Sequence, residues 1–85
     1  MFRILVAEDD LPLQKMMCAF LGLNGYQTTA AADGEEALEA IDHVLPDLVI
    51  ADVMMPRMDG WELTKELRSL YPQLPIMLVT ARDTL

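Results

Sequence analysis

The chain has little of the chemistry that disulfide, metal-cluster and nucleic-acid-binding proteins need. Its 85 residues include one cysteine and one histidine, so an intrachain disulfide and a cysteine-based metal cluster are excluded. Six basic residues stand against fourteen acidic ones, for a net charge of -8, and the basic residues are scattered. Such a surface repels nucleic acid and anionic membranes. We therefore expect no direct nucleic-acid binding by this segment.

Long apolar runs are also missing. The amino terminus offers only the run 4–7 before three acidic residues, which is too short for a signal peptide or a membrane span. We expect a cytoplasmic protein that makes no use of a membrane. With 53% hydrophobic and 24% charged residues, the composition is that of a soluble globular protein, and 85 residues form at most one domain.

Short apolar runs alternate with helical patterns along the chain. The runs 4–7, 48–51 and 75–79 are typical of buried parallel strands, and the more polar run 26–31 predicts a strand near the sheet edge. Apolar residues at helical spacing predict a first helix between Pro12 and Asn24, a second capped by Asp33, and a third from Trp61 to Leu70. Strands alternating with helices imply an α/β fold, with a parallel sheet covered on both faces.

Acidic side chains follow the predicted strands. Glu8, Asp9 and Asp10 come after the first strand, Asp52 ends the third, and Thr80 ends the fourth. Functional groups of an open parallel sheet gather beyond the carboxyl ends of its strands, so we expect these residues to meet. Crowded carboxylates repel one another, and a bound cation relieves this repulsion. Oxygen ligands without histidine or cysteine favour a hard cation, so we predict Mg²⁺ with Asp52 as the third carboxylate ligand.

Asp52 is the candidate nucleophile of this cluster. A carboxylate can attack phosphorus and form an acyl phosphate when a metal neutralises the oxygens that gain charge. Thr80 could donate its hydroxyl to a phosphoryl oxygen. The pattern thus predicts a site that converts phosphorylation into a loop movement.

As a set, these residues resemble the receiver domain of bacterial response regulators over the whole chain. The resemblance rests on the segment 3–10, on Asp52-Val53-Met54-Met55-Pro56, on Asp59-Gly60 and on Val79-Thr80-Ala81, in that order. It implies a flavodoxin-like doubly wound sheet of strand order 2-1-3-4. It also implies Mg²⁺ held by Glu8, Asp9, Asp52 and the Met54 carbonyl, with Thr80 as the switch hydroxyl and Asp10 as a helix cap.

The same resemblance implies a partner and an output. Asp52 would be phosphorylated from the phosphohistidine of a sensor histidine kinase or a phosphotransfer protein. The chain would then be a phosphoacceptor rather than an enzyme, at most catalysing its own phosphorylation and dephosphorylation. The Glu-Asp-Asp sequence at residues 8–10 is similar to that of regulators with a winged-helix DNA-binding domain, so transcription regulation by an output domain absent here is expected.

The sequence departs from the family pattern at its carboxyl end. The fifth strand, its phosphoryl-pairing lysine and the last helices are missing from the chain, and Lys65 on the third helix cannot replace that lysine. Asp83 looks like the cap of a fourth helix that does not develop. We expect residues 1–85 to be the N-terminal part of one receiver domain, without a second domain. Such a fragment would be weakly stable, and its apolar edge at 76–79 would favour self-association.

Two other functions fit parts of the pattern. A Mg²⁺-dependent phosphohydrolase of the haloacid dehalogenase type also uses an aspartate nucleophile, but it needs a second acid two residues later, where this chain has Met54. A receiver-like protein-interaction module that is never phosphorylated remains the alternative function, because the lysine is missing. Leu13, Met16 and Met17 are candidates for a kinase-docking face, since flexible methionine suits adaptable contacts.

Overall fold

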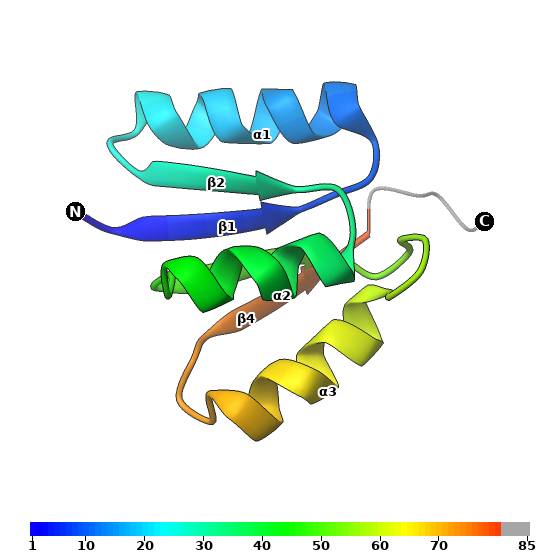
Figure 1. Ribbon diagram of the computed structural model, residues 1–85. Helices are drawn as coiled ribbons and strands as arrows, with labels where there is room; N and C mark the ends of the chain where they lie inside the picture. The colour runs from blue at the N-terminus through cyan, green and yellow to red at the C-terminus, as the bar shows by residue number, and fades with distance from the viewer. Residues whose placement is uncertain (81–85) are drawn as a thin grey trace.

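The structure, a computed structural model, describes residues 1–80. Strands and helices alternate along it (Figure 1), in the order β1 (Arg3–Ala7), α1 (Leu11–Leu23), β2 (Gln27–Ala31), α2 (Gly34–His43), β3 (Leu48–Asp52), α3 (Gly60–Leu70) and β4 (Ile76–Val79). The strands form one sheet of order β2-β1-β3-β4 in which every neighbouring pair is parallel. The predicted fold class, a flavodoxin-like doubly wound sheet of order 2-1-3-4, is confirmed. The predicted helix cap at Asp83 lies outside the described residues.

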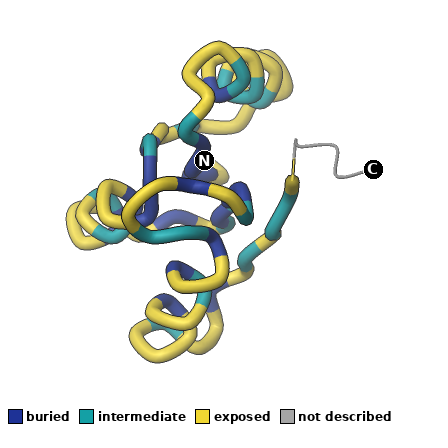
Figure 2. The backbone as a smooth tube through the Cα atoms, turned by 90° about the vertical axis from the view of Figure 1, so that its right-hand side faces the viewer, coloured by how far each residue is buried: buried dark blue, intermediate teal, exposed yellow. Residues whose placement is uncertain are grey.

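Helices cover both faces of the sheet. Figure 1 shows α1 on one side and α2 with α3 on the other, and Figure 2 shows the same layers viewed from the carboxyl ends of the strands. The main core lies between the sheet and the α2 and α3 pair. It consists of Leu5, Ala7, Ala31, Ala37, Ile41, Val49, Ala51, Met55, Leu63, Leu67 and Leu74.

The position of each strand explains its composition. β1 pairs with β2 on one side and β3 on the other, so all four residues of its apolar run are buried. β2 is an edge strand, as predicted, and its threonines are exposed or half-buried. β4 forms the opposite edge, where the side chain of Met77 is 50% exposed. The predicted apolar edge is therefore present in the described part of the chain, while self-association through it stays a prediction.

Aspartate caps set the beginning of each helix. Asp10, Asp33 and Asp59 precede α1, α2 and α3, and each accepts a hydrogen bond from the backbone N–H three residues later. Such a cap stabilises a helix by about 1 kcal/mol. The cap roles expected of Asp10 and Asp33 are confirmed. The third helix begins at Gly60 rather than at Trp61, because its cap is Asp59.

Candidate functional site

The acidic residues predicted to meet do so at the carboxyl end of the sheet. Ala7 on β1 pairs with Ala51 on β3, so the next residue of each strand, Glu8 and Asp52, lie side by side beyond the pair. One carboxylate oxygen each from Glu8, Asp9 and Asp52 lies within 4.8 Å of the other two. This is the point at which the strand order reverses, where α/β sheets place their ligands.

Burial makes this cluster unusual. The side chains of Glu8 and Asp52 are each 1% exposed. Oε2 of Glu8 accepts a hydrogen bond from the Asp10 amide at 3.2 Å, but Oε1 has no hydrogen-bond partner among the described residues. Burial, together with the neighbouring Asp52 and Asp9 carboxyls, raises the pKa of Glu8 to about 7, although the Asp10 amide opposes this.

The donor set fits a hard divalent cation. An unsatisfied buried carboxylate oxygen costs free energy unless a partner is supplied, and a cation supplies one for several oxygens at once. Three carboxylates at this spacing, without sulfur or imidazole, match the oxygen ligands of Mg²⁺. The predicted ligands Glu8, Asp9 and Asp52 are thus together, and their binding of Mg²⁺ stays a prediction.

Met54 lies beside the same cluster. Its backbone N–H donates to Oδ1 of Asp52 at 3.2 Å, which holds the Asp52 side chain in place. Met54 and Asp9 also line one open hollow of about 370 Å³. The carbonyl of Met54 remains the predicted fourth protein ligand.

Thr80 follows β4 at the same edge. Val79 pairs with Asp52 in the β3 and β4 register, so Thr80 comes one residue beyond the strand position next to the predicted acceptor. Its side chain is exposed. The predicted switch role of its hydroxyl is compatible with this place in the fold and stays a prediction.

Gln14 supports the site and was not predicted. Its buried side-chain amide donates to the carbonyl of Glu8 at 3.0 Å and to that of Ala31 at 3.1 Å. The Glu8 amide also donates to the Ala31 carbonyl at 2.9 Å. These bonds tie the end of β1 to β2 and to α1, so the Glu8 backbone is held from two sides. A polar residue on the otherwise apolar inner face of the first helix was the signal in the sequence.

Gly60 permits α3 to begin directly against the predicted acceptor. Its amide donates to the carbonyl of Val53 at 3.0 Å, and a Cβ built at this position would lie 2.4 Å from the backbone oxygen of Asp52. Backbone cannot yield as a flexible side chain does. The Asp59-Gly60 pair therefore serves two needs at once, a cap for α3 and a close approach to the end of β3.

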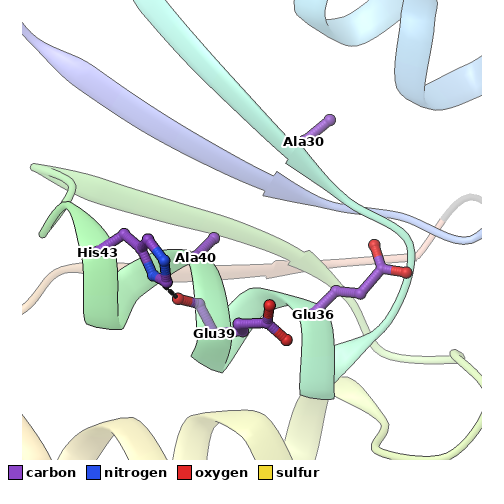
Figure 3. Close-up of a pocket in the computed structure, with 5 residues that line it drawn as sticks. All are labelled: Ala30, Glu36, Glu39, Ala40 and His43. Carbon is purple, nitrogen blue, oxygen red and sulfur yellow. Dashed lines mark hydrogen bonds between the residues drawn. The ribbon is translucent and has the colours of Figure 1, made fainter.

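A larger hollow elsewhere in the described residues does not bring polar side chains together as the acidic cluster does. Figure 3 shows it between β2 and α2, lined by Ala30, Glu36, Glu39, Ala40 and His43, with a volume of about 500 Å³. Glu36 accepts from the Ala32 amide at 2.9 Å, and the His43 ring nitrogen lies 3.0 Å from the Glu39 carbonyl. Figure 3 shows the polar side chains strung along α2 rather than gathered at one point. The acidic cluster is the stronger candidate site.

Comparison with known proteins identifies the family of the chain. The model of the response regulator receiver domain matches residues 4–85, and the chain belongs to this family. Members of this family are signalling proteins rather than classical enzymes. Among the residues described, no helix is both long enough and apolar enough to cross a membrane.

The relatives include longer regulators. The response regulator MprA of Mycobacterium sp. (strain KMS) is 48% identical over 82 residues, which cover 96% of this chain and 36% of that protein. MprA of Mycobacterium avium (strain 104) is 46% identical over the same length. The chain therefore spans about a third of the length of these curated relatives.

Solved structures share the fold. The chemotaxis protein CheY4 of Vibrio cholerae is 35% identical with a TM-score of 0.91, and the match covers 99% of this chain and 72% of that one. The response regulator TrrA of Thermotoga maritima, solved in complex with Mg²⁺-BeF, is 36% identical with a TM-score of 0.92, covering 98% and 72% of the two chains.

We expect Gly60→Ala to destabilise the protein by about 1–3 kcal/mol, because the new methyl group must displace the backbone of Asp52. Urea unfolding measures the change. Gly22→Ala in α1 is the matched control, since nothing lies within 4 Å of its added Cβ and alanine favours a helix. Equal midpoints for the two variants would contradict the close approach.

We expect the metal-free protein to lose stability as pH rises from 4.5 to about 7. In this window folded Glu8, with its pKa raised from 4.5 to about 7, holds a proton that the unfolded chain has released. The loss is at most about 3 kcal/mol. The lowered pKa of Asp33 has its effect below 3.8, outside the window.

Thermal or urea unfolding at several pH values in a chelator measures this slope. Glu8→Gln keeps the shape of the side chain without the titration, so the slope over this window should flatten. Mg²⁺ should restore stability to the parent protein at pH 7.5. A parent and a Glu8→Gln variant with the same pH profile would refute the role of Glu8.

Proposed function

We propose that this chain is the phosphoacceptor part of a signalling switch, in which Asp52 receives a phosphoryl group from the phosphohistidine of a sensor histidine kinase or a phosphotransfer protein. The observation that carries this proposal is the meeting of Glu8, Asp9 and Asp52 within 4.8 Å at the carboxyl ends of β1 and β3. The family supports it, since receiver domains of response regulators interact with such kinases and phosphotransfer proteins.

Glu8, Asp9, Asp52 and the Met54 carbonyl are the groups that would hold Mg²⁺. When bound there, Mg²⁺ would neutralise phosphoryl oxygens as they gain charge. The structure of TrrA in complex with Mg²⁺-BeF is a parallel in a relative. The buried oxygen Oε1 of Glu8, which lacks a hydrogen-bond partner among the described residues, would gain a partner in this way.

Asp52 would act as the nucleophile. A bond forms between a carboxylate oxygen of Asp52 and phosphorus, while the bond from phosphorus to the imidazole nitrogen of the donor breaks and its electron pair stays on that nitrogen. The Met54 amide, bound to Oδ1 at 3.2 Å, keeps the side chain from rotating away.

Thr80 would then report the new phosphoryl group. Its hydroxyl would donate to a phosphoryl oxygen and draw the end of β4 toward β3, since Val79 already pairs with Asp52. We place this switch in the cytoplasm and expect it to control an output domain, most simply a transcriptional one. That domain would belong to a longer protein such as the MprA relatives, of which this chain spans 36%.

α1 offers a surface on which the partner could dock. Of the three residues expected there, Met16 is exposed, and Leu13 and Met17 are half-buried. Phe20 and Leu23 are also exposed, and with Met16 they follow helical spacing along one side of α1. A receiver-like interaction module that is never phosphorylated would use the same surface, so phosphorylation itself must separate the two functions.

Incubation with acetyl phosphate and Mg²⁺, read by intact mass, tests the proposal. The parent should gain one phosphoryl group, and chelation of Mg²⁺ should abolish the gain. Asp52→Asn should gain none, because a neutral amide is not a nucleophile for this transfer. Asp42→Asn, a matched change at an exposed carboxylate on α2, should behave as the parent.

The opposite result is equally specific. A parent that gains no phosphate would favour the interaction module, and phosphorylation that persists in Asp52→Asn would place the acceptor at another residue.

A further inference from the structure

The loop between β3 and α3 contains a strained turn at Arg57. Among the described residues, Arg57 is the one non-glycine residue with a positive φ, at 63°. The Met58 amide donates to the Pro56 carbonyl at 2.7 Å and closes a three-residue turn around it. Turns of this kind are rare and strained when the central φ is positive, and they persist only where the surroundings hold them.

Ion pairs hold the side chain of Arg57. Its guanidinium contacts the carboxylate of Asp33, and its Nε lies 3.3 Å from Oε1 of Glu35. Asp33 is the cap of α2, with a side chain 3% exposed that also accepts from the Glu36 amide at 2.9 Å. The hydrogen bonds and the guanidinium lower the pKa of Asp33, so this carboxylate stays charged near neutral pH. The Arg57 side chain, itself 61% exposed, is therefore held by one buried carboxylate, that of Asp33, and by one exposed carboxylate, that of Glu35.

The backbone next to Arg57 is tied to the same helix end. The Gly34 amide, at the beginning of α2, donates to the Met58 carbonyl at 3.1 Å. A Cβ at Gly34 would lie 2.6 Å from that carbonyl oxygen, so no side chain fits between loop and helix. The loop is thus attached to α2 by a side chain at residue 57 and by backbone at residue 58.

This attachment borders the acidic site. Asp9, Asp33, Pro56 and Arg57 line one hollow of about 400 Å³. The same loop carries Met54, whose amide binds Asp52 and whose carbonyl is a predicted metal ligand. Movement of the strained turn would therefore change the position of residue 54 relative to Glu8 and Asp9.

We propose that Arg57 is a positioning residue, whose ion pair with Asp33 holds the β3–α3 loop in the conformation that binds Mg²⁺. This inference rests on the proposed function, because it assigns the loop a place in the Mg²⁺ site. It also assigns a role to α2, because the amino-terminal end of this helix becomes a fixed support for the β3–α3 loop.

Mg²⁺ titration of the variants, followed by amide chemical shifts in NMR spectra, tests the inference. Arg57→Gln should raise the Mg²⁺ Kd about tenfold, as expected when a residue that supports a metal ligand is lost. Lys65→Gln, the same charge change at an exposed position of α3, should leave the Kd within about twofold. An unchanged Kd in Arg57→Gln would overturn the proposal.

A double-mutant cycle identifies the partner. Asp33→Asn keeps an oxygen that can cap α2 but removes the charge that pairs with Arg57, so it too should weaken Mg²⁺ binding. If the two residues act as a pair, the double variant should bind Mg²⁺ about as weakly as the weaker single variant. If the losses of Mg²⁺ affinity in the two single variants multiply in the double variant, the two residues act independently, which would contradict the proposed pairing.

Two further measurements separate positioning from general stability. Arg57→Gly removes the ion pair but relieves the strain of the positive φ, so this variant should unfold at a higher urea concentration than Arg57→Gln, whether or not a chelator is present. Its Kd for Mg²⁺ should nevertheless be as high as that of Arg57→Gln. A Kd for Arg57→Gly equal to that of the parent would refute positioning by the side chain.

Hydrogen exchange of the Gly34 amide reads the attachment without any metal. In a chelator, exchange of this amide should be about tenfold faster in Arg57→Gln than in the parent, and Lys65→Gln should match the parent. A parent that binds no Mg²⁺ would contradict the proposed function, and this exchange rate would then decide the attachment by itself. Equal exchange rates of the Gly34 amide in the parent and in Arg57→Gln would overturn the proposed attachment of the loop to α2.

Discussion

The mutual repulsion of carboxylates at the ends of β1 and β3 governs how the surrounding structure is built. Glu8 and Asp52 are almost completely buried, and Asp9 brings a third carboxylate oxygen within 4.8 Å of theirs. Water cannot solvate the buried charges, so the protein either holds a proton on Glu8 or accepts a cation. The raised pKa of Glu8, about 7, is the first response, and Mg²⁺ binding would be the second.

Bringing such groups together requires a rigid frame, and the fold supplies it from three sides. The fully buried β1 aims Glu8, and Gln14 fixes its backbone carbonyl from α1. The close approach of Gly60 secures the end of β3, and the contacts of α2 with Arg57 hold the loop that follows. The free energy released by burying apolar strands thus offsets the cost of crowding charges at one end of them. Under the proposed function the same arrangement would make the site responsive, because a phosphoryl group on Asp52 would add charge to carboxylates that already repel one another.

Much of this could be predicted from the sequence, because its signals are local. Apolar runs that stop at Glu8 and Asp52 place both residues at strand ends, and parallel strands bring their carboxyl ends to one edge. The cap at Asp33 follows from Glu36 three residues later, whereas the cap at Asp10 was implied by the family resemblance. The bond from Gln14 to Ala31 and the pair of Arg57 with Asp33 could not be predicted, since the partners lie 17 and 24 residues apart and their contact depends on how helices pack on the sheet. The positive φ of Arg57 has no signal in its residue type, because glycine or asparagine is the usual choice there.

Mg²⁺ titration of the unmodified chain tests whether Glu8, Asp9 and Asp52 form one binding site for a divalent cation. Amide chemical shifts report each residue separately. We expect saturable shifts concentrated at residues 8–9 and 52–54, and we expect these shifts to be lost when Asp9 is changed to asparagine. Shifts that are absent, that do not saturate, or that spread evenly over the acidic surface would contradict it.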